Sequence, residues 1–322
     1  MRYGAGIDTS APIPEIVEQV RSLAAAGFRS AGCSQIFGYD AMTLLAVVGS
    51  QVPDIELMTA VVPTYPRHPI VMAAQALTVQ AATGGRFTLG IGLSHQIVIE
   101  GMFGHSFERP ARHMRDYLKA LMPLLHDRKV DYTGPTLKAS TMMPLEFDGP
   151  APQVLVAALA PTMLELAGTL ADGTITWMAG PATIGSHIVP GITKAAEAAG
   201  RPAPRVVVAL PVCVTADPDG ARQRADQTFS IYGQLPSYRA MLDREGAAGP
   251  GNVAIVGDED AVAHQLAALD DAGATDFGQS VRHAGGDEPD DGPAGEPRPR
   301  RLRLPGGVRR AGGGTSPGRC RA

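Results

Sequence analysis

The strongest constraint on the fold is an alternation of short apolar runs with longer amphipathic segments, which continues to about residue 280. Eight runs have the length and apolar character of buried strands, and every run but the last precedes a segment with helical spacing of apolar residues. The predicted strands are Arg2–Asp8, Ser30–Gln35, Ile55–Val62, Phe87–Leu93, Val154–Leu159, Thr174–Trp177, Val206–Val214 and Ala274–Phe277. The predicted helices are Pro14–Phe28, Tyr39–Val52, His68–Ala82, Arg109–Leu125, Thr162–Ala171, one that ends near Gly200, Gly220–Arg244 and Asp260–Ala272.

Strands that are apolar throughout and are separated by helices indicate a parallel sheet covered on both faces. Eight such units in about 280 residues fit a closed barrel better than an open sheet. We therefore predict the α/β class and a (β/α)₈ TIM barrel. A proline-rich connection, Asp131–Pro152, interrupts the alternation and predicts an insertion after the fourth helix.

The composition changes at residue 281. Residues 281–322 hold 10 Gly, 6 Pro and 9 Arg, with no Lys and no aromatic residue. A segment with so little apolar surface cannot offset the entropy of ordering it. We predict a barrel domain over residues 1–280 and a disordered Gly/Pro/Arg-rich tail over residues 281–322. The same composition is typical of a GC-rich gene read out of frame, which is our hypothesis for the origin of the tail.

Several classes of protein are excluded by composition. The net charge of −4 argues against a nucleic-acid binder. The sequence contains no run of about 18 apolar residues, so no membrane span is predicted. The first residues lack the pattern of a secretory signal. Cys33, Cys213 and Cys320 are too far apart in sequence for a disulfide framework or a zinc knuckle. We predict a cytoplasmic protein with a small-molecule substrate, compatible with a homodimer.

The active site of such a barrel lies at the carboxyl ends of its strands. These ends supply one carboxylate, Asp8, where a glycosidase needs two. They supply one imidazole, His95, which is too few ligands for a metal, so no metal site is predicted. The remaining apolar surface suits a large flat organic cofactor that brings its own chemistry.

Three motifs carry a specific resemblance. They read PTYPRHP at 63–69, GGRFTLGIG at 84–92 and APTMLELAGTLADG at 160–173. Together with neighbouring segments they resemble the luciferase-like monooxygenase superfamily from Arg2 to Phe277. More narrowly, they are similar to the actinobacterial subgroup that uses the deazaflavin coenzyme F420.

The resemblance implies an oxidoreductase that transfers a hydride between reduced F420 and a small, apolar organic substrate. The first alternative is an FMN-dependent monooxygenase on the same barrel. The second is a non-catalytic barrel that only binds the cofactor, because the expected pattern dissolves just after Phe277, where a final helix should follow.

The resemblance also implies three cofactor-binding segments. A non-prolyl cis peptide that supports the ring should fall at Thr59–Ala60 or Ala60–Val61. The turn after the fourth strand should meet the ring, with His95 as proton donor or merely as a hydrogen-bonding group. The turn after the fifth strand should bind the anionic tail near a helix N-terminus. The implied cofactor-binding residues are Thr59, Ala60, Val61, Leu93, Ser94, Gln96, Ala158, Leu159, Ala160 and Pro161.

The substrate pocket is expected to contain Gln35, Phe37, Trp177 and Met178. Sugar-phosphate dehydrogenases of this superfamily carry Asp-His where this chain has Gln35 and Ile36, and a lysine near Gly180. These departures argue against a sugar phosphate and favour an uncharged substrate. Trp177 could alternatively be a core residue. Cys33 and Cys213 are expected to be buried and inert.

Overall fold

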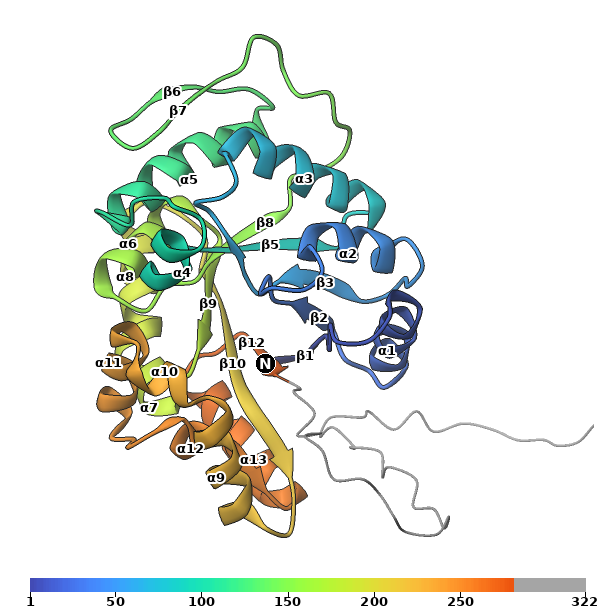
Figure 1. The fold of residues 1–322 in the computed structure, drawn as a ribbon, viewed down its shortest axis with the longest axis vertical. Helices are drawn as coiled ribbons and strands as arrows, with labels where there is room; N and C mark the ends of the chain where they lie inside the picture. The colour runs from blue at the N-terminus through green and yellow to red at the C-terminus, as the bar shows by residue number, and fades with distance from the viewer. Residues whose placement is uncertain (281–322) are drawn as a thin grey trace, which may run out of the picture. The chain divides into compact units, whose positions relative to one another are not determined.

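Parallel strands close into a barrel in the computed structural model, which describes residues 1–280 (Figure 1). Each strand pairs in parallel with the next, and the last pairs with the first, with Arg2 opposite Asp276. The eight barrel strands are β1 (Arg2–Gly6), β2 (Ser30–Cys33), β3 (Glu56–Thr59), β5 (Phe87–Gly92), β8 (Gln153–Val156), β9 (Gly173–Trp177), β10 (Arg205–Val214) and β12 (Asp276–Ser280). The predicted TIM barrel is confirmed. The predicted disordered tail, residues 281–322, lies outside the described residues.

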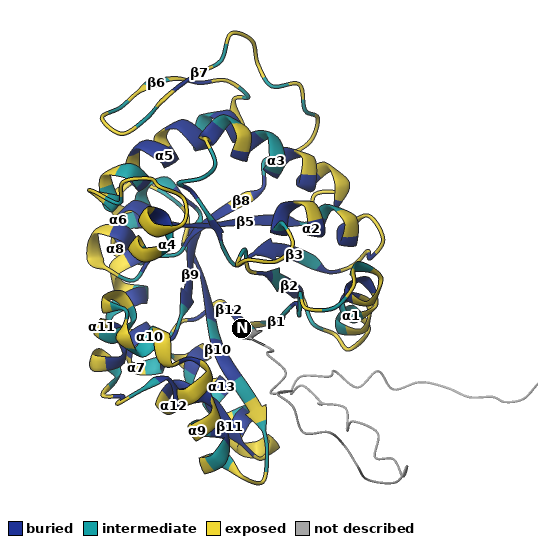
Figure 2. Ribbon diagram, in the orientation of Figure 1, coloured by how far each residue is buried: buried dark blue, intermediate teal, exposed yellow. Residues whose placement is uncertain are grey.

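Seven helices of the described chain follow the barrel strands and pack on the strands or on one another. They are α1 (Ile13–Ala25), α2 (Ala41–Gly49), α3 (Pro69–Ala82), α5 (Pro110–His126), α6 (Pro161–Leu170), α8 (Val189–Ala198) and α13 (Glu259–Asp271). Proline occupies the first turn of several of them, where its missing N–H costs nothing. Figure 2 shows their inner faces buried and their outer faces exposed. None of the helices in residues 1–280 is both long and apolar enough to cross a bilayer.

The remaining short elements lie in the connections. They are β4 (Val62–Pro63), α4 (Gln96–Gly101), α7 (Pro181–Thr183), the π-helix η1 (Ile184–Ile188), α9 (Pro218–Thr228), α10 (Ser230–Gln234), α11 (Pro236–Glu245), α12 (Pro250–Val253) and β11 (Ile255–Gly257). The single helix predicted over Gly220–Arg244 is wrong, because the chain leaves helical geometry twice. Phe229 has φ −107° and ψ 16°, and Leu235 is extended, as is usual for a residue before proline.

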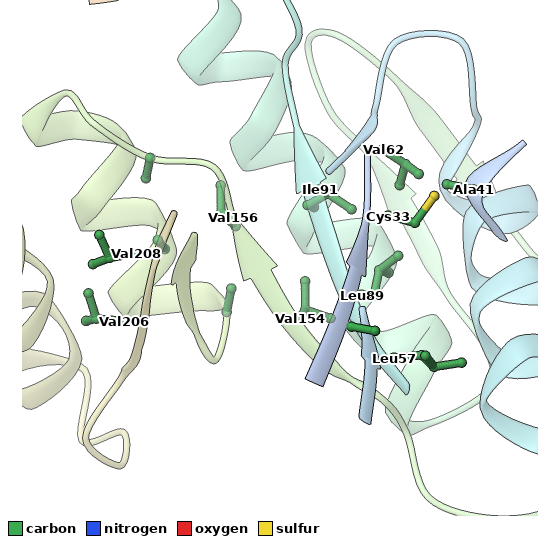
Figure 3. Close-up of a cluster of buried hydrophobic side chains, with 14 of the residues drawn as sticks. Cys33, Ala41, Leu57, Val62, Leu89, Ile91, Val154, Val156, Val206 and Val208 are labelled. Atoms are coloured by element: carbon green, nitrogen blue, oxygen red, sulfur yellow. The ribbon is translucent and has the colours of Figure 1, made fainter. Parts of the chain in front are cut away.

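The main hydrophobic core lies between the barrel and its helices. Figure 3 shows buried side chains of this layer, most of them from neighbouring barrel strands, and all of those labelled are at most 2% exposed. They include Leu57, Leu89, Val156 and Val208. Cys33 is buried there as predicted, whereas the prediction that Cys213 is buried is wrong. Cys213 lies in the last three residues of β10, Val212–Val214. These residues pair with β11, whereas the preceding part of β10 pairs with the barrel strand β12.

A layer of charged and polar side chains closes the amino-terminal end of the barrel. The Arg205 guanidinium lies within 3.1 Å of both Glu56 and Asp276 carboxylates. Burial raises the pKa of Asp276, but the hydrogen bonds from Arg205 and Thr275 outweigh it and hold that pKa below its usual value. This end is therefore fixed by ion pairs and is not open to a ligand.

The predicted insertion is confirmed as an antiparallel hairpin, β6 (Asp131–Thr133) and β7 (Lys138–Ser140). It lies beyond α5 and α3 in Figure 1. The Asp116 carboxylate on α5 accepts hydrogen bonds from the Tyr132 hydroxyl at 2.8 Å and from the Thr136 amide at 2.9 Å. These bonds anchor the hairpin to the barrel.

Candidate active site

The inner wall at the carboxyl end of the barrel is lined by very small residues. They are Gly6, Gly32, Ala60, Ala157, Ala209 and Gly278, and all six are partly exposed. Their strand neighbours that face the helices are buried. One layer deeper, Met58, Leu155, Ile175 and Val207 fill the axis and are at most 7% exposed. Solvent therefore reaches into the barrel only as far as this apolar floor. We call this hollow the mouth.

One side of the mouth is a bulge between β3 and β4. The peptide bond Ala60–Val61 is cis, at one of the two predicted positions. The two residues after Cys33, the last residue of β2, bind the carbonyl groups of Ala60 and Val61. Ser34 Oγ donates to Ala60 O at 2.7 Å, and Gln35 N donates to Val61 O at 3.2 Å. A Cβ atom at Gly92 would lie 2.7 Å from Val61 Cγ2, so any side chain at this position would displace the Val61 side chain. The bulge is thus fixed by both neighbouring strands.

Thr59 lies behind the bulge and not in the mouth. It is fully buried, and its hydroxyl donates to Gly90 O at 2.7 Å and accepts from Gly90 N at 2.8 Å. Both hydrogen-bonding functions of the hydroxyl are used within the barrel wall. Thr59 therefore supports the bulge from behind, while Ala60 and Val61 are the partly exposed residues.

The turn after β5 presents His95 at the start of α4. Ser94 adopts a left-handed conformation with φ 61°, and the partly exposed His95 occupies the N-cap of α4. Within the described residues the imidazole makes no hydrogen bond, and burial lowers its pKa. Leu93 is partly exposed, while Gln96 is exposed and donates to Glu100 at 2.9 Å. In this turn, the His95 imidazole is therefore the group available to donate or accept a proton.

An aromatic wall connects His95 to Trp177 at the end of β9. The centroid of the His95 ring lies 5.8 Å from that of Tyr238, and Tyr238 lies 5.1 Å from Tyr232. Trp177 packs edge-on against Tyr232 at 5.8 Å and against Phe229 at 5.4 Å. Phe229, Tyr232 and Tyr238 were not predicted to meet, because a single continuous helix over Gly220–Arg244 would give no reason to place them together. Their aromatic type, rare in this chain, was the available signal.

The other predicted substrate residues are dispersed. Phe37 is 67% exposed on the loop after β2, and Gln35 Oε1 is already used, accepting from Ala41 N at 2.8 Å. Met178 is fully buried in the main core with φ 58°. The structure does not bring Met178 to the mouth, because the left-handed backbone places it in the layer beneath the helices.

The turn predicted to bind an anionic tail leads into α6. Ala158 is fully buried, and the Leu159 carbonyl is 2.8 Å from His187 Nε2. Ala160 is the exposed N-cap and makes no side-chain cap, and Pro161 follows it. Pro161 has no N–H, and Met163 N and Leu164 N donate to Ala160 O at 2.9 and 3.0 Å. Within the described residues Thr162 N is therefore the first-turn amide left for an anion.

A cavity of about 550 Å³ lies beside the bulge. We call it the arginine pocket, because Arg67, Arg109 and Arg112 line it. It begins directly after β4, where Thr64 N donates to Gly92 O at 2.9 Å. This pocket was not predicted from the sequence, although the arginines in PTYPRHP and in residues 105–113 were an available signal. Within residues 1–280 no three His, Cys, Asp or Glu side chains are grouped so that they could hold a metal.

The chain is similar in sequence to several known proteins. The profile of the luciferase-like monooxygenase family matches residues 1–276. An uncharacterized protein of Mycobacterium tuberculosis is 26% identical over 222 residues, and the match spans 65% of each chain. The 5,10-methylenetetrahydromethanopterin reductase of Methanolobus tindarius is 27% identical over 248 residues, which are 76% of this chain and 75% of that enzyme.

Solved structures share the fold. An F420-dependent secondary alcohol dehydrogenase in complex with an F420–acetone adduct aligns with a TM-score of 0.75 at 15% identity, covering 87% of this chain and 92% of that one. A type II Baeyer–Villiger monooxygenase from Pseudomonas putida in complex with FMN aligns with a TM-score of 0.70 at 16% identity, covering 88% and 92%.

Proposed function

The chain belongs to the luciferase-like monooxygenase family, and from this premise we propose that it is an F420-dependent oxidoreductase. The enzyme would transfer a hydride between the reduced deazaflavin and a small, uncharged organic substrate. Relatives include the reductase of Methanolobus tindarius, and a protein of the same fold binds an F420–acetone adduct.

The observation that carries the proposal is the mouth itself. Six glycine and alanine positions leave the inner wall free of bulky side chains, with an apolar floor beneath them. A flat ring system fits such a site, whereas a polar sugar would find few partners there. The bulge at Ala60–Val61 bounds one side, and His95 and the aromatic wall bound another.

Each group around the mouth has a distinct role in this proposal. When bound, the cofactor supplies or accepts the hydride. Ala60 and Val61 support the ring, and the Thr162 amide at the start of α6 binds its anionic tail. His95 gives a proton from a ring nitrogen to the reduced substrate, or removes one in the reverse direction. Trp177 and its aromatic neighbours exclude water and favour an apolar substrate.

The experiment that tests the proposal is a titration of the purified chain with F420 and, separately, with FMN. Trp177 is the single tryptophan, so its fluorescence reports on the mouth. We expect F420 to quench this fluorescence saturably and FMN to bind more weakly. Tight binding of FMN without binding of F420 would establish the alternative, an FMN-dependent monooxygenase. This alternative is supported by a monooxygenase of the same fold whose structure contains FMN.

A further measurement separates an enzyme from a barrel that only binds the cofactor. Reduced F420 is mixed with the protein and a panel of activated alkenes, imines and ketones, and its oxidation is followed. Turnover with any member supports the proposal. Cofactor binding without turnover, in either direction of hydride transfer, would favour the non-catalytic alternative.

A further inference from the structure

The arginine pocket is separate from every group that the proposed function uses. Three segments build it, residues 64–69 after β4, residues 105–117 at the start of α5, and residues 135–137 of the hairpin. Its volume of about 550 Å³ lies within the range of small-molecule binding sites and is far larger than the volume of a single phosphate ion.

The charge of the pocket opposes that of the whole chain. Residues 1–280 carry 27 acidic and 19 basic side chains, yet the pocket is lined by three arginines and only one carboxylate, Glu108. A cluster of cations in an acidic protein attracts anions locally. The pocket therefore selects negative charge against the field of the rest of the barrel.

Two of the arginines are not neutralised. Arg67 forms an ion pair with Asp40, but within the described residues no carboxylate lies within 4 Å of the Arg109 or Arg112 guanidinium. Asp116 acts on Arg112 only through space, since its oxygens already accept from Tyr132 and Thr136. Arg109 and Arg112 therefore have hydrogen-bond donors available for a ligand.

The N-terminus of α5 adds to the positive charge of the pocket. Arg109 is the N-cap of this 17-residue helix, with φ 52° and no side-chain cap, so the positive end of the helix opens at the pocket. Tyr65 contributes its aromatic ring to the lining, stacked on His113 with ring centroids 3.9 Å apart.

We propose that the arginine pocket binds a small molecule carrying two or more carboxylate or phosphate groups, held by Arg109 and Arg112. Two sources share this chemistry: the anionic side chain of the bound cofactor, held here instead of at the start of α6, or a free acidic small molecule. Only the first rests on the proposed function. The bond from Thr64 N to Gly92 O places the pocket directly beside the mouth, so either source can reach it.

The first test is a calorimetric titration of the full chain with citrate and with inorganic phosphate. We expect citrate to bind more tightly than phosphate, and the double variant Arg109→Gln/Arg112→Gln to weaken citrate binding at least about tenfold. Arg115→Gln is the matched control, since Arg115 is an exposed residue of the same helix outside the pocket. Circular dichroism checks that each variant is folded. Absence of citrate binding, or equal binding by the folded double variant, overturns the proposal.

The second test identifies the source. FMN is compared with riboflavin, and F420 with its deazaflavin chromophore lacking the phosphate and the acidic tail. If the double variant binds only the anionic cofactor forms more weakly, the natural ligand is the anionic side chain of the cofactor. If it binds citrate more weakly but every cofactor form as before, the natural ligand is a free acidic small molecule. If neither cofactor binds while citrate still does, the proposed function fails and the pocket proposal stands.

Discussion

Arg205 on β10 holds Asp276 on β12 by two parallel hydrogen bonds, Nε to Oδ2 at 3.0 Å and Nη2 to Oδ1 at 2.8 Å. Both side chains are nearly buried, at 8% and 2% exposed. The same guanidinium reaches Glu56 on β3, across the barrel axis. One cation thus ties the last strand to two others at the end of the barrel away from the mouth.

Replacing Arg205 by Met should strongly destabilise the protein. The apolar side chain fills similar space but leaves buried Asp276 and partly buried Glu56 with Arg2, which is half exposed, as their cation among the described residues. We expect a loss of about 3 kcal/mol. Urea denaturation measures it. Asp276→Asn, which keeps a hydrogen-bonding group, should cost less. A loss under about 1 kcal/mol for Arg205→Met would show that the network contributes little.

The same network predicts how stability responds to acid. Burial opposes ionisation of Asp276, but its bonds to Arg205 and Thr275 lower its pKa in the folded state. The ionised Asp276 carboxylate therefore stabilises the fold at pH values above the ordinary aspartate pKa of about 3.9. This contribution is lost as the pH falls through the lowered pKa of the folded state. Asp276→Asn should unfold with a shallower pH dependence below about pH 4 than the unaltered protein. Parallel curves of unfolding free energy against pH would contradict this.

Thr59→Val should separate hydrogen bonding from shape at the bulge. Valine matches the volume but removes the bonds to both backbone groups of Gly90, leaving a buried N–H unsatisfied. We expect a loss of about 1–3 kcal/mol in the free energy of unfolding. Thr59→Ser keeps the hydroxyl and should cost less, so chemical denaturation of both variants decides the point. If the two cost the same, the hydroxyl is not what fixes the bulge.

The barrel could be predicted because its strands are continuous apolar runs bounded by clear turn residues. Pairing of Arg2 with Asp276 then closes the sheet as eight parallel strands must. What failed depends on tertiary contacts. Cys213 looked buried because strand pattern does not tell which end of a long strand passes beyond its neighbours. Met178 looked accessible because a left-handed backbone, φ 58°, is invisible in sequence.

The site was predictable in part for a related reason. The cis peptide at Ala60–Val61 and the turn at His95 lie within contiguous motifs, so a resemblance could locate them. The aromatic wall and the arginine pocket each combine residues from distant segments. Tyr238 meets His95 across 143 positions of the chain, and no local pattern records such a contact.

Filling the mouth should abolish cofactor binding without unfolding the barrel. A Cβ at Gly32 would lie 3.5 Å from Ala60 Cβ, an ordinary contact, so a larger side chain fits the wall but projects into the hollow. Gly32→Leu should weaken F420 binding at least about tenfold, followed by Trp177 fluorescence. Ala25→Leu, at the exposed end of α1, is the control. Unchanged affinity in a folded Gly32→Leu protein would place the cofactor elsewhere.

His95→Gln should impair turnover while leaving cofactor affinity intact. Glutamine keeps polarity but cannot give up a proton, and removing a general acid costs about 10²–10⁴-fold in rate. Because burial lowers the pKa of His95, reduction of substrate should slow as pH rises through a value below the ordinary value of about 6.5, and the variant should lose this limb. Stopped-flow oxidation of reduced F420 across pH measures both effects. His264→Gln, the same change at an exposed position of α13, is the control. A His95→Gln enzyme with unaltered rate and pH profile would assign the proton to another donor.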